Sequence, residues 1–349
     1  MCKINFIIRI SPHFSFSYHE IQALKLSLPG QFIFRLKTAI AMRKRRKFYR
    51  GITNHVYQRT VNGEQLFYCL EDCLVFYTIL SVCARTAEIE VLELCIMHNH
   101  THSLIKAESM EQLSSFVDHY TSWFVREYNT FANRKGKLFK KNFGSAPKWD
   151  EKKLRSAIIY IGNNPVEKHF CKRAIEHRWN FLAYKDCCYP FSEKLSRRES
   201  SKGLLKALKE VDLMVKLNLP LKYAQLIRLN KKLSLKEREQ LTDYIIYSYL
   251  PFDYEGLSSH FKSFESMLTA MDSTTGDDFD INEQRDGFSL TAFLEMMTYM
   301  ERSMEKHEVR KATALPFEKK MQLYRELRFN TSATEYQICN FLHLNIPKD

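Results

Sequence analysis

The stretch IEVLELCIMHNHTHSLI, residues 89–105, contains two apolar runs joined by a short polar connection. Runs of this length bounded by polar residues indicate strands, so we expect strands over 89–97 and 100–105. Apolar residues at helical spacing flank them on both sides, over 66–84 and 110–132. The stretch therefore predicts the central hairpin of a domain that contains both helices and strands.

Further elements extend this pattern in both directions. Residues 51–60 are rich in β-branched and aromatic side chains, and the turn signal Asn62-Gly63 follows them, so they predict a strand. Residues 138–146 predict another strand, and residues 150–164 predict a helix that ends before Pro165. The order β-α-β-β-α-β-α predicts an α+β fold: a ferredoxin-like split βαβ domain with an antiparallel sheet and one added helix.

The chain divides into three parts by composition. Residues 1–47 form a basic leader without a sustained period, which is either a loosely ordered arm or a segment upstream of a true start at Met42. Residues 48–185 contain the predicted α+β domain. Residues 186–349 predict an all-α C-terminal region, with an acidic exposed loop near 273–286. The helical segments at its end favour a helical hairpin over an incomplete helix-turn-helix unit.

Composition limits the class of protein and its partners. Of 349 residues, 45% are hydrophobic and 27% are charged, which is typical of a globular protein. The net charge of +13 indicates nucleic acid or another anionic partner. The nine cysteines include no CxxC pair, which favours reduced thiols in a cytosolic protein, and no apolar run is long enough to predict a spanning helix.

Two histidines on the second predicted strand are the first candidates for chemistry. Residues i and i+2 of a strand point to the same face, so His100 and His102 present two imidazoles side by side. Such a pair can ligate a metal, and His98 would share the face if the strand were regular there. Taken alone, the pattern is more typical of surface or packing histidines than of a metal site.

The helix predicted over 150–164 carries the second candidate pair. Tyr160 and Asn164 are four residues apart, so they lie on one helical face at the flank of the buried stripe. A rigid element thus presents a phenol and an amide oxygen together. Taken alone, Tyr160 is more typical of a tyrosine at the boundary between core and solvent than of a nucleophile.

Together the two motifs resemble the HUH single-strand endonucleases, specifically bacterial insertion-sequence transposases with one catalytic tyrosine and their REP-associated branch. That family carries M-P-[ND]-H-x-H-x-L-[IV], and residues 97–105 read MHNHTHSLI. It also carries Y-I-x-x-N-P-V-[KE], and residues 160–167 read YIGNNPVE. Residues 136–143, GKLFKKNF, are similar to its G-x-L-[WF]-Q-x-R-[FY] segment. The resemblance covers about residues 48–185, with His98 in place of the usual proline.

The resemblance implies a metal-dependent transposase or endonuclease that acts on single-stranded DNA. Tyr160 would attack a backbone phosphate, leaving a 5′-phosphotyrosine link and a free 3′-hydroxyl. His100, His102 and Asn164 would hold Mg²⁺ or Mn²⁺, because a phenol is a poor nucleophile without activation. The covalent link conserves the energy for rejoining, so no ATP is required.

Basic stretches suit a path for the DNA backbone, although solvated surface charges are the simpler alternative. Aromatic residues lie among them as possible stacking surfaces for bases: Phe48, Tyr49, Phe139, Phe143 and Trp149. The predicted DNA-binding residues are Arg43, Arg45, Arg46, Lys47, Arg134, Lys137, Lys140 and Lys141. We expect single-stranded or hairpin DNA as the partner of a monomer or homodimer in the bacterial cytoplasm, with no membrane.

Two other interpretations compete with a DNA-cleaving enzyme. The first is a non-catalytic or domesticated protein of the same fold that binds hairpin DNA. The second is a structural zinc site formed by Cys95, His98, His100 and His102. The zinc site is disfavoured because Cys95 points away from the histidine face if the strand alternates regularly.

Overall fold

The computed structural model describes residues 48–140, 143–274 and 287–345, which all belong to one compact unit. The predicted leader and most of the predicted acidic loop lie outside the described residues. Within the described part, no helix is long and apolar enough to cross a membrane.

Four antiparallel strands form one sheet in the order β2-β3-β1-β4. The strands are β1 (Asn54–Arg59), β2 (Glu90–Ile96), β3 (His100–Lys106) and β4 (Gly144–Pro147). The two central strands, β3 and β1, are far apart in sequence. The predicted ferredoxin-like antiparallel sheet is therefore confirmed.

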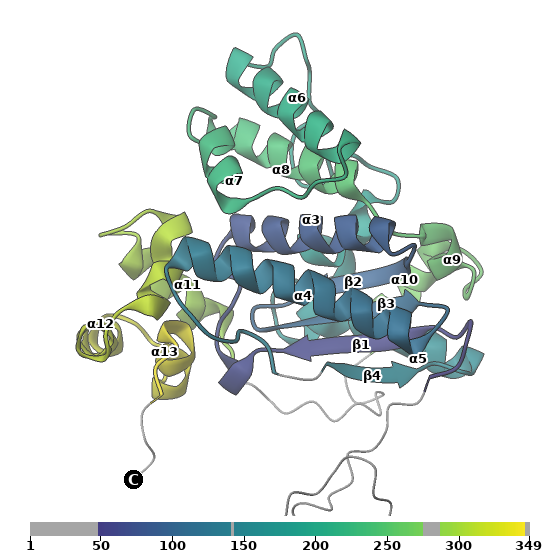
Figure 1. Cartoon of the computed structure of the whole chain (residues 1–349), viewed down its shortest axis with the longest axis horizontal. Helices are drawn as coiled ribbons and strands as arrows, with labels where there is room; N and C mark the ends of the chain where they lie inside the picture. The colour runs from purple at the N-terminus through teal and green to yellow at the C-terminus, as the bar shows by residue number, and fades with distance from the viewer. Residues whose placement is uncertain (1–47, 141–142, 275–286, 346–349) are drawn as a thin grey trace, which may run out of the picture. The chain divides into compact units, whose positions relative to one another are not determined.

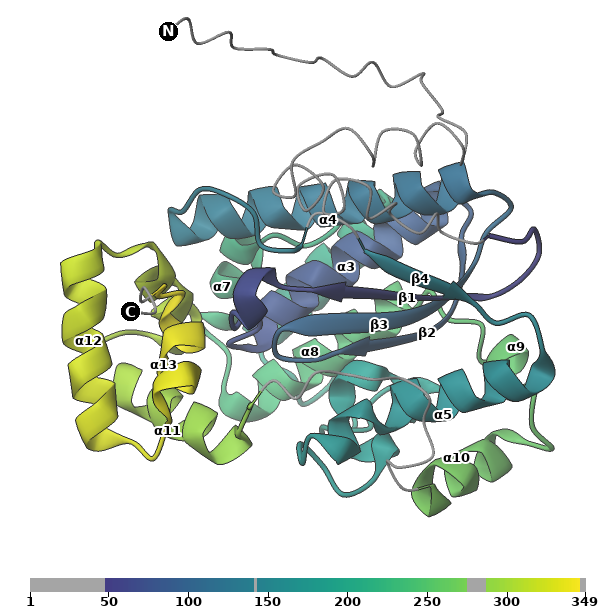
Figure 2. The ribbon, with the colours of Figure 1, turned by 90° about the horizontal axis from the view of Figure 1, so that it is seen from below.

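Helices cover the two faces of the sheet unequally. Helices α3 (Leu70–Thr86) and α4 (Met110–Ala132) pack on one face, where they share a core with Val56 and Ile105 of the strands (Figure 1). Helix α5 (Glu151–Glu167) lies on the other face and packs its apolar stripe against Leu104. Figure 2 shows α5 beside β2, at one side of the sheet.

Helix α5 differs from its predicted bounds at the C-terminal end. It continues to Glu167, so Pro165 lies inside the last turn and the prediction that the helix ends before it was wrong. Tertiary contacts hold this turn despite the missing N–H of proline. The side chain of Asn163 donates a 2.7 Å hydrogen bond to the Met271 carbonyl, and Asn164 and Pro165 are both buried.

Strand β4 is shorter than predicted. It begins at Gly144, whereas Leu138 and Phe139 turn inward and pack in the core on the α3 and α4 side. Phe139 forms only an isolated bridge with Thr60. Leu138, Phe139 and Phe143 therefore supply core side chains rather than strand length.

The C-terminal region is helical, as predicted. Its α-helices are α6 (Lys202–Lys216), α7 (Tyr223–Asn230), α8 (Leu235–Tyr249), α9 (Tyr254–Ser258), α10 (Phe264–Ser273), α11 (Leu290–Met300), α12 (Phe317–Asn330) and α13 (Glu335–Leu342). Among the described residues of the whole chain, the 3₁₀ segments are η1 (Val61–Gly63), η2 (Ala174–Glu176), η3 (Arg178–Asn180), η4 (Leu182–Tyr184) and η6 (Lys306–Ala314). Helices α11 to α13 build a core of their own, which Tyr68 joins from the loop before α3.

A buried ion pair joins this region to α3. Arg310 of η6 and Asp72 of α3 are both fully buried, and their charged atoms lie 2.7 Å apart. The guanidinium also lies over the Tyr223 ring, whose hydroxyl donates to Asp72 at 2.9 Å. The N–H groups of Tyr68 and Cys69 also donate to the carboxylate.

Removing Arg310 should destabilise the protein severely. Arg310→Ala leaves the Asp72 charge buried without its counter-ion, which lowers the free energy of unfolding by about 3–5 kcal/mol. Urea denaturation followed by circular dichroism measures this. The neighbouring Lys311→Ala, which removes an exposed pair with Glu308, is the matched control and should change stability by less than about 1 kcal/mol. Equal midpoints for the two variants would contradict the role of the ion pair.

Candidate active site

The four residues predicted to carry the chemistry converge on the α5 face of the sheet. Nε2 of His100 lies 3.2 Å from Oδ1 of Asn164, and Nδ2 of Asn164 lies 3.5 Å from the Tyr160 hydroxyl. The ring of His102 packs edge-on against the Tyr160 ring, with 5.5 Å between centroids. Strand β3 thus supplies two imidazoles, and α5 supplies the phenol and the amide.

The hydrogen bonds around His100 fix its tautomer. The side-chain N–H of Asn99 donates to the Gly63 carbonyl at 3.0 Å, which leaves the Asn99 oxygen facing Nδ1 of His100 at 2.7 Å. Nδ1 must then carry the hydrogen, so Nε2 presents a lone pair. This lone pair faces the Oδ1 of Asn164, itself an acceptor. Nε2 of His100 and Oδ1 of Asn164 are thus two acceptors that point toward each other, an arrangement that a cation between them would stabilise.

His55 on β1 belongs to the same cluster and was missed by sequence reasoning. Its Nε2 lies 2.9 Å from Nδ1 of His102, and its ring packs edge-on against Tyr160 at 6.0 Å. This contact orients the His102 imidazole, as partners of metal-binding histidines commonly do. Alternation within β1 predicts that His55, Tyr57 and Arg59 share one face of the strand. Only the pairing of β1 with β3 shows that this face is also the face of His102.

The donor set fits a divalent cation held by two imidazoles and one amide oxygen. Among the described residues, no group of three or more His, Cys, Asp or Glu side chains is arranged to hold a metal. A cation here therefore needs the Asn164 oxygen as well as His100 and His102. This donor set leaves coordination positions for phosphate oxygens and water.

The reason given against a zinc site was wrong, although no described group supports such a site. Cys95 pairs directly with His102 across the β2–β3 hairpin, so the two side chains share a face. The prediction assumed that side chains keep alternating between faces through the turn that joins β2 to β3. The turn breaks this alternation, so an odd-numbered residue of β2 and an even-numbered residue of β3 can share a face. Cys95 packs instead in the apolar cluster beneath α5.

The cluster is buried, with one exposed ring at its margin. Tyr160 is 2% exposed and His102 is 1% exposed, whereas Tyr57 is 39% exposed. Glu93 lies on the same sheet face, opposite Leu104. Burial raises the pKa of the Glu93 carboxyl well above its usual range, which favours the neutral acid, so this group adds little negative charge near the histidines.

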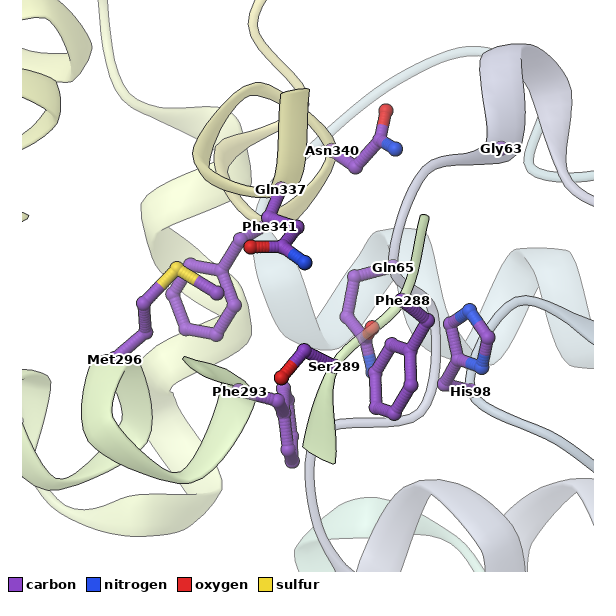
Figure 3. Close-up of a pocket in the computed structure, with 10 residues that line it drawn as sticks. All are labelled: Gly63, Gln65, His98, Phe288, Ser289, Phe293, Met296, Gln337, Asn340 and Phe341. Carbon is purple, nitrogen blue, oxygen red and sulfur yellow. The ribbon is translucent and has the colours of Figure 1, made fainter. Parts of the chain in front are cut away.

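His98 lies at the turn that precedes β3 and contacts the C-terminal region. Its ring stacks on Phe288 with centroids 3.8 Å apart (Figure 3). Phe288 stacks in turn on Phe170. The His98 carbonyl accepts hydrogen bonds from the N–H groups of Leu66 and Phe67. His98 is therefore placed to pack against the helical region, next to the candidate active site.

The structure describes three of the predicted DNA-binding residues, Arg134, Lys137 and Lys140. Arg43, Arg45, Arg46, Lys47 and Lys141 lie outside the described residues. Lys140 is exposed and its N–H pairs with the Arg59 carbonyl, one strand away from His100. Arg134 and Lys137 lie in the turn after α4, where Arg134 lines a polar cavity together with Lys320 and Glu64.

The predicted stacking surfaces need a correction. Phe139 and Phe143 are buried in the core on the α3 side, so neither ring is available to a base. The spacing of apolar residues at 138, 139 and 143 reflects this burial. Tyr49 and Trp149 are exposed, and the Lys153 amine lies 3.4 Å from the centre of the Trp149 ring.

Comparison with known proteins supports the resemblance carried by the two motifs. Residues 38–164 match the family described as "Transposase IS200 like". This span contains the sheet, both histidines, Tyr160 and Asn164. The family resemblance predicted from the sequence is thereby confirmed, and we call residues 48–185 the transposase-like domain.

One solved structure is similar to this chain at low overall identity. It is described as a REP-associated tyrosine transposase bound to a REP hairpin, with 18% sequence identity and a TM-score of 0.34. The similarity covers 39% of this chain and 79% of that one. No curated protein matches the chain.

Proposed function

We propose that the chain is a metal-dependent transposase that cleaves and rejoins single-stranded DNA through a tyrosine, with a hairpin as the element it recognises. The observation that carries the proposal is the contact of Asn164 with both Tyr160 and His100. One amide thereby links the nucleophile on α5 to the metal-binding strand β3. The match to IS200-like transposases supports the same reaction class.

In the proposed reaction, the Tyr160 oxygen forms a bond to the phosphorus of a backbone phosphate. The bond from phosphorus to the 3′ oxygen breaks, and that oxygen leaves with the electron pair and takes up a proton. The phenol proton passes to solvent. The 5′ end is then held as a phosphotyrosine, and attack by a 3′-hydroxyl reverses the step.

The residues around Tyr160 have different roles in this step. His100, His102 and Asn164 would hold Mg²⁺ or Mn²⁺, and the bound ion supplies Lewis-acid stabilisation of charge on the phosphate. His55 fixes the orientation of His102, and Asn99 fixes the tautomer of His100. Because the cluster is buried in the structure, binding of the strand must be accompanied by opening of the site.

A covalent adduct tests the proposed function directly. The protein is incubated with labelled single-stranded or hairpin DNA from the flanks of its own gene, in the presence of Mn²⁺, and resolved on a denaturing gel. An adduct that survives denaturation, together with a fragment ending in a 3′-hydroxyl, is the expected result. Binding without any adduct would instead favour the non-catalytic hairpin-binding alternative.

Affinity should favour single strands and hairpins over duplex and should fall steeply with salt. Each phosphate neutralised on a single strand contributes about 0.7 to the slope of log affinity against log salt. Deleting residues 1–47 removes Arg43, Arg45, Arg46 and Lys47, so it should weaken binding and flatten the slope, with cleavage retained at saturating DNA. Titrations of both proteins at several salt concentrations measure this. Equal affinity for all three DNA forms would contradict the single-strand preference.

A further inference from the structure

Tyr57 is the exposed member of the ring cluster around the candidate active site. Its side chain lies on the His102 face of the sheet, because the two residues are directly paired between β1 and β3. The ring centroid lies 6.4 Å from that of His102 and 5.7 Å from that of His55. Tyr57 is 39% exposed, whereas His55, His100, His102 and Tyr160 are each at most 3% exposed. Of these rings, it is therefore the one that an approaching strand can contact first.

The ring of Tyr57 packs on Gly144 of the edge strand β4. The two residues are paired across β1 and β4. A Cβ atom at position 144 would lie only 1.9 Å from Cζ of Tyr57 and 2.2 Å from Cε1. The ring therefore lies directly against the glycine backbone, and the residue remains 39% exposed. Any larger residue at 144 would displace the ring.

Two basic residues occur close to Tyr57 along the backbone of the sheet. Arg59 is on the same face of β1, opposite His100, and the backbone of the exposed Lys140 pairs with that of Arg59. An aromatic face next to cations is the arrangement that binds single-stranded nucleic acid, because bases stack on the ring while phosphates contact the charges. The position next to His102 restricts which base is involved to one near the reacting phosphate.

We propose that Tyr57 is the stacking platform for the base next to the scissile phosphate, and that Gly144 holds the ring in place. This inference rests on the proposed function, since it assigns a substrate-positioning residue to that reaction. Stacking on a phenol ring tolerates every base, so Tyr57 positions the strand without reading its sequence. The tyrosine hydroxyl is not needed for this role.

Binding measurements in a cleavage-deficient background test the platform. In the Tyr160→Phe protein, Tyr57→Ala and Tyr57→Leu should each lower affinity for a 25-nucleotide oligo(dT) strand about tenfold, and Tyr57→Phe should retain it. The leucine of Tyr57→Leu still packs over Gly144 but offers no ring to a base. This variant therefore distinguishes a loss of base stacking from a loss of packing on the glycine. Tyr247→Ala, which removes a tyrosine 44% exposed on α8, is the matched control and should leave affinity unchanged.

Photocrosslinking locates the contact independently. Oligo(dT) with 5-iodouracil at every fourth position is irradiated with the Tyr160→Phe protein, and mass spectrometry should find the cross-linked base on Tyr57. Lower thermal stability of Tyr57→Leu with unchanged affinity, or cross-links at other aromatic residues only, would overturn the platform. Failure of the reaction itself is seen separately: a wild-type protein that forms no adduct but cross-links at Tyr57 refutes the cleavage and leaves Tyr57 as a residue that stacks on bound bases.

Discussion

Tyr160→Phe should abolish the covalent DNA adduct and leave affinity for the DNA almost unchanged. The substitution removes only the hydroxyl, which is the atom that bonds to phosphorus in the proposed reaction. Its contact with Asn164, at 3.5 Å, is at the limit of a hydrogen bond, so its loss has little effect on packing there. Affinity depends on backbone charge and stacking rather than on this oxygen.

A denaturing gel with labelled DNA and Mn²⁺ shows the adduct, and fluorescence anisotropy measures affinity for the same strand. Tyr247→Phe, an exposed tyrosine on α8, serves as the control and should form the adduct at the wild-type level. An adduct that persists in the Tyr160→Phe protein would exclude Tyr160 as the nucleophile.

Loss of either strand histidine should have the second large effect. His100→Ala and His102→Ala each remove one of three proposed metal ligands, so cleavage should fall by about a hundredfold or more. The affinity of each variant for Mn²⁺ should also be lower than that of the wild-type protein. Electron paramagnetic resonance of Mn²⁺ titrated into each variant measures this without any reaction.

His98→Ala is the matched control for both substitutions. His98 stacks on Phe288 and meets the His100 ring edge-on, with 5.9 Å between centroids, but it is not one of the proposed ligands. This variant should therefore keep most of its cleavage and its Mn²⁺ affinity. If His98→Ala were as inactive as the other two, the proposed ligand set would be incorrect.

Elements of the transposase-like domain were predicted correctly where the periodicity of a single segment determines them, and wrongly where long-range contacts do. Helix α4 has its predicted bounds, 110–132, because its buried stripe and the Ser109 cap are both encoded within the segment. The end of α5 was predicted wrongly because a long-range contact from Asn163 to Met271 stabilises it. Leu138, Phe139 and Phe143 were assigned to a strand because pattern alone does not distinguish a strand from a buried loop.

The sequence by itself determined the order of helices and strands, the shared face of His100 and His102, and the pairing of Tyr160 with Asn164 on one helix. Each of these follows from a period of two or 3.6 within one element. Only the tertiary structure decided that His55 contacts His102, that Cys95 shares the histidine face, and that Tyr57 lies over Gly144 at the margin of the site. These relations depend on which strands pair and in which register. Pairing and register are set by long-range packing, so they are not visible in the periodicity of any single segment.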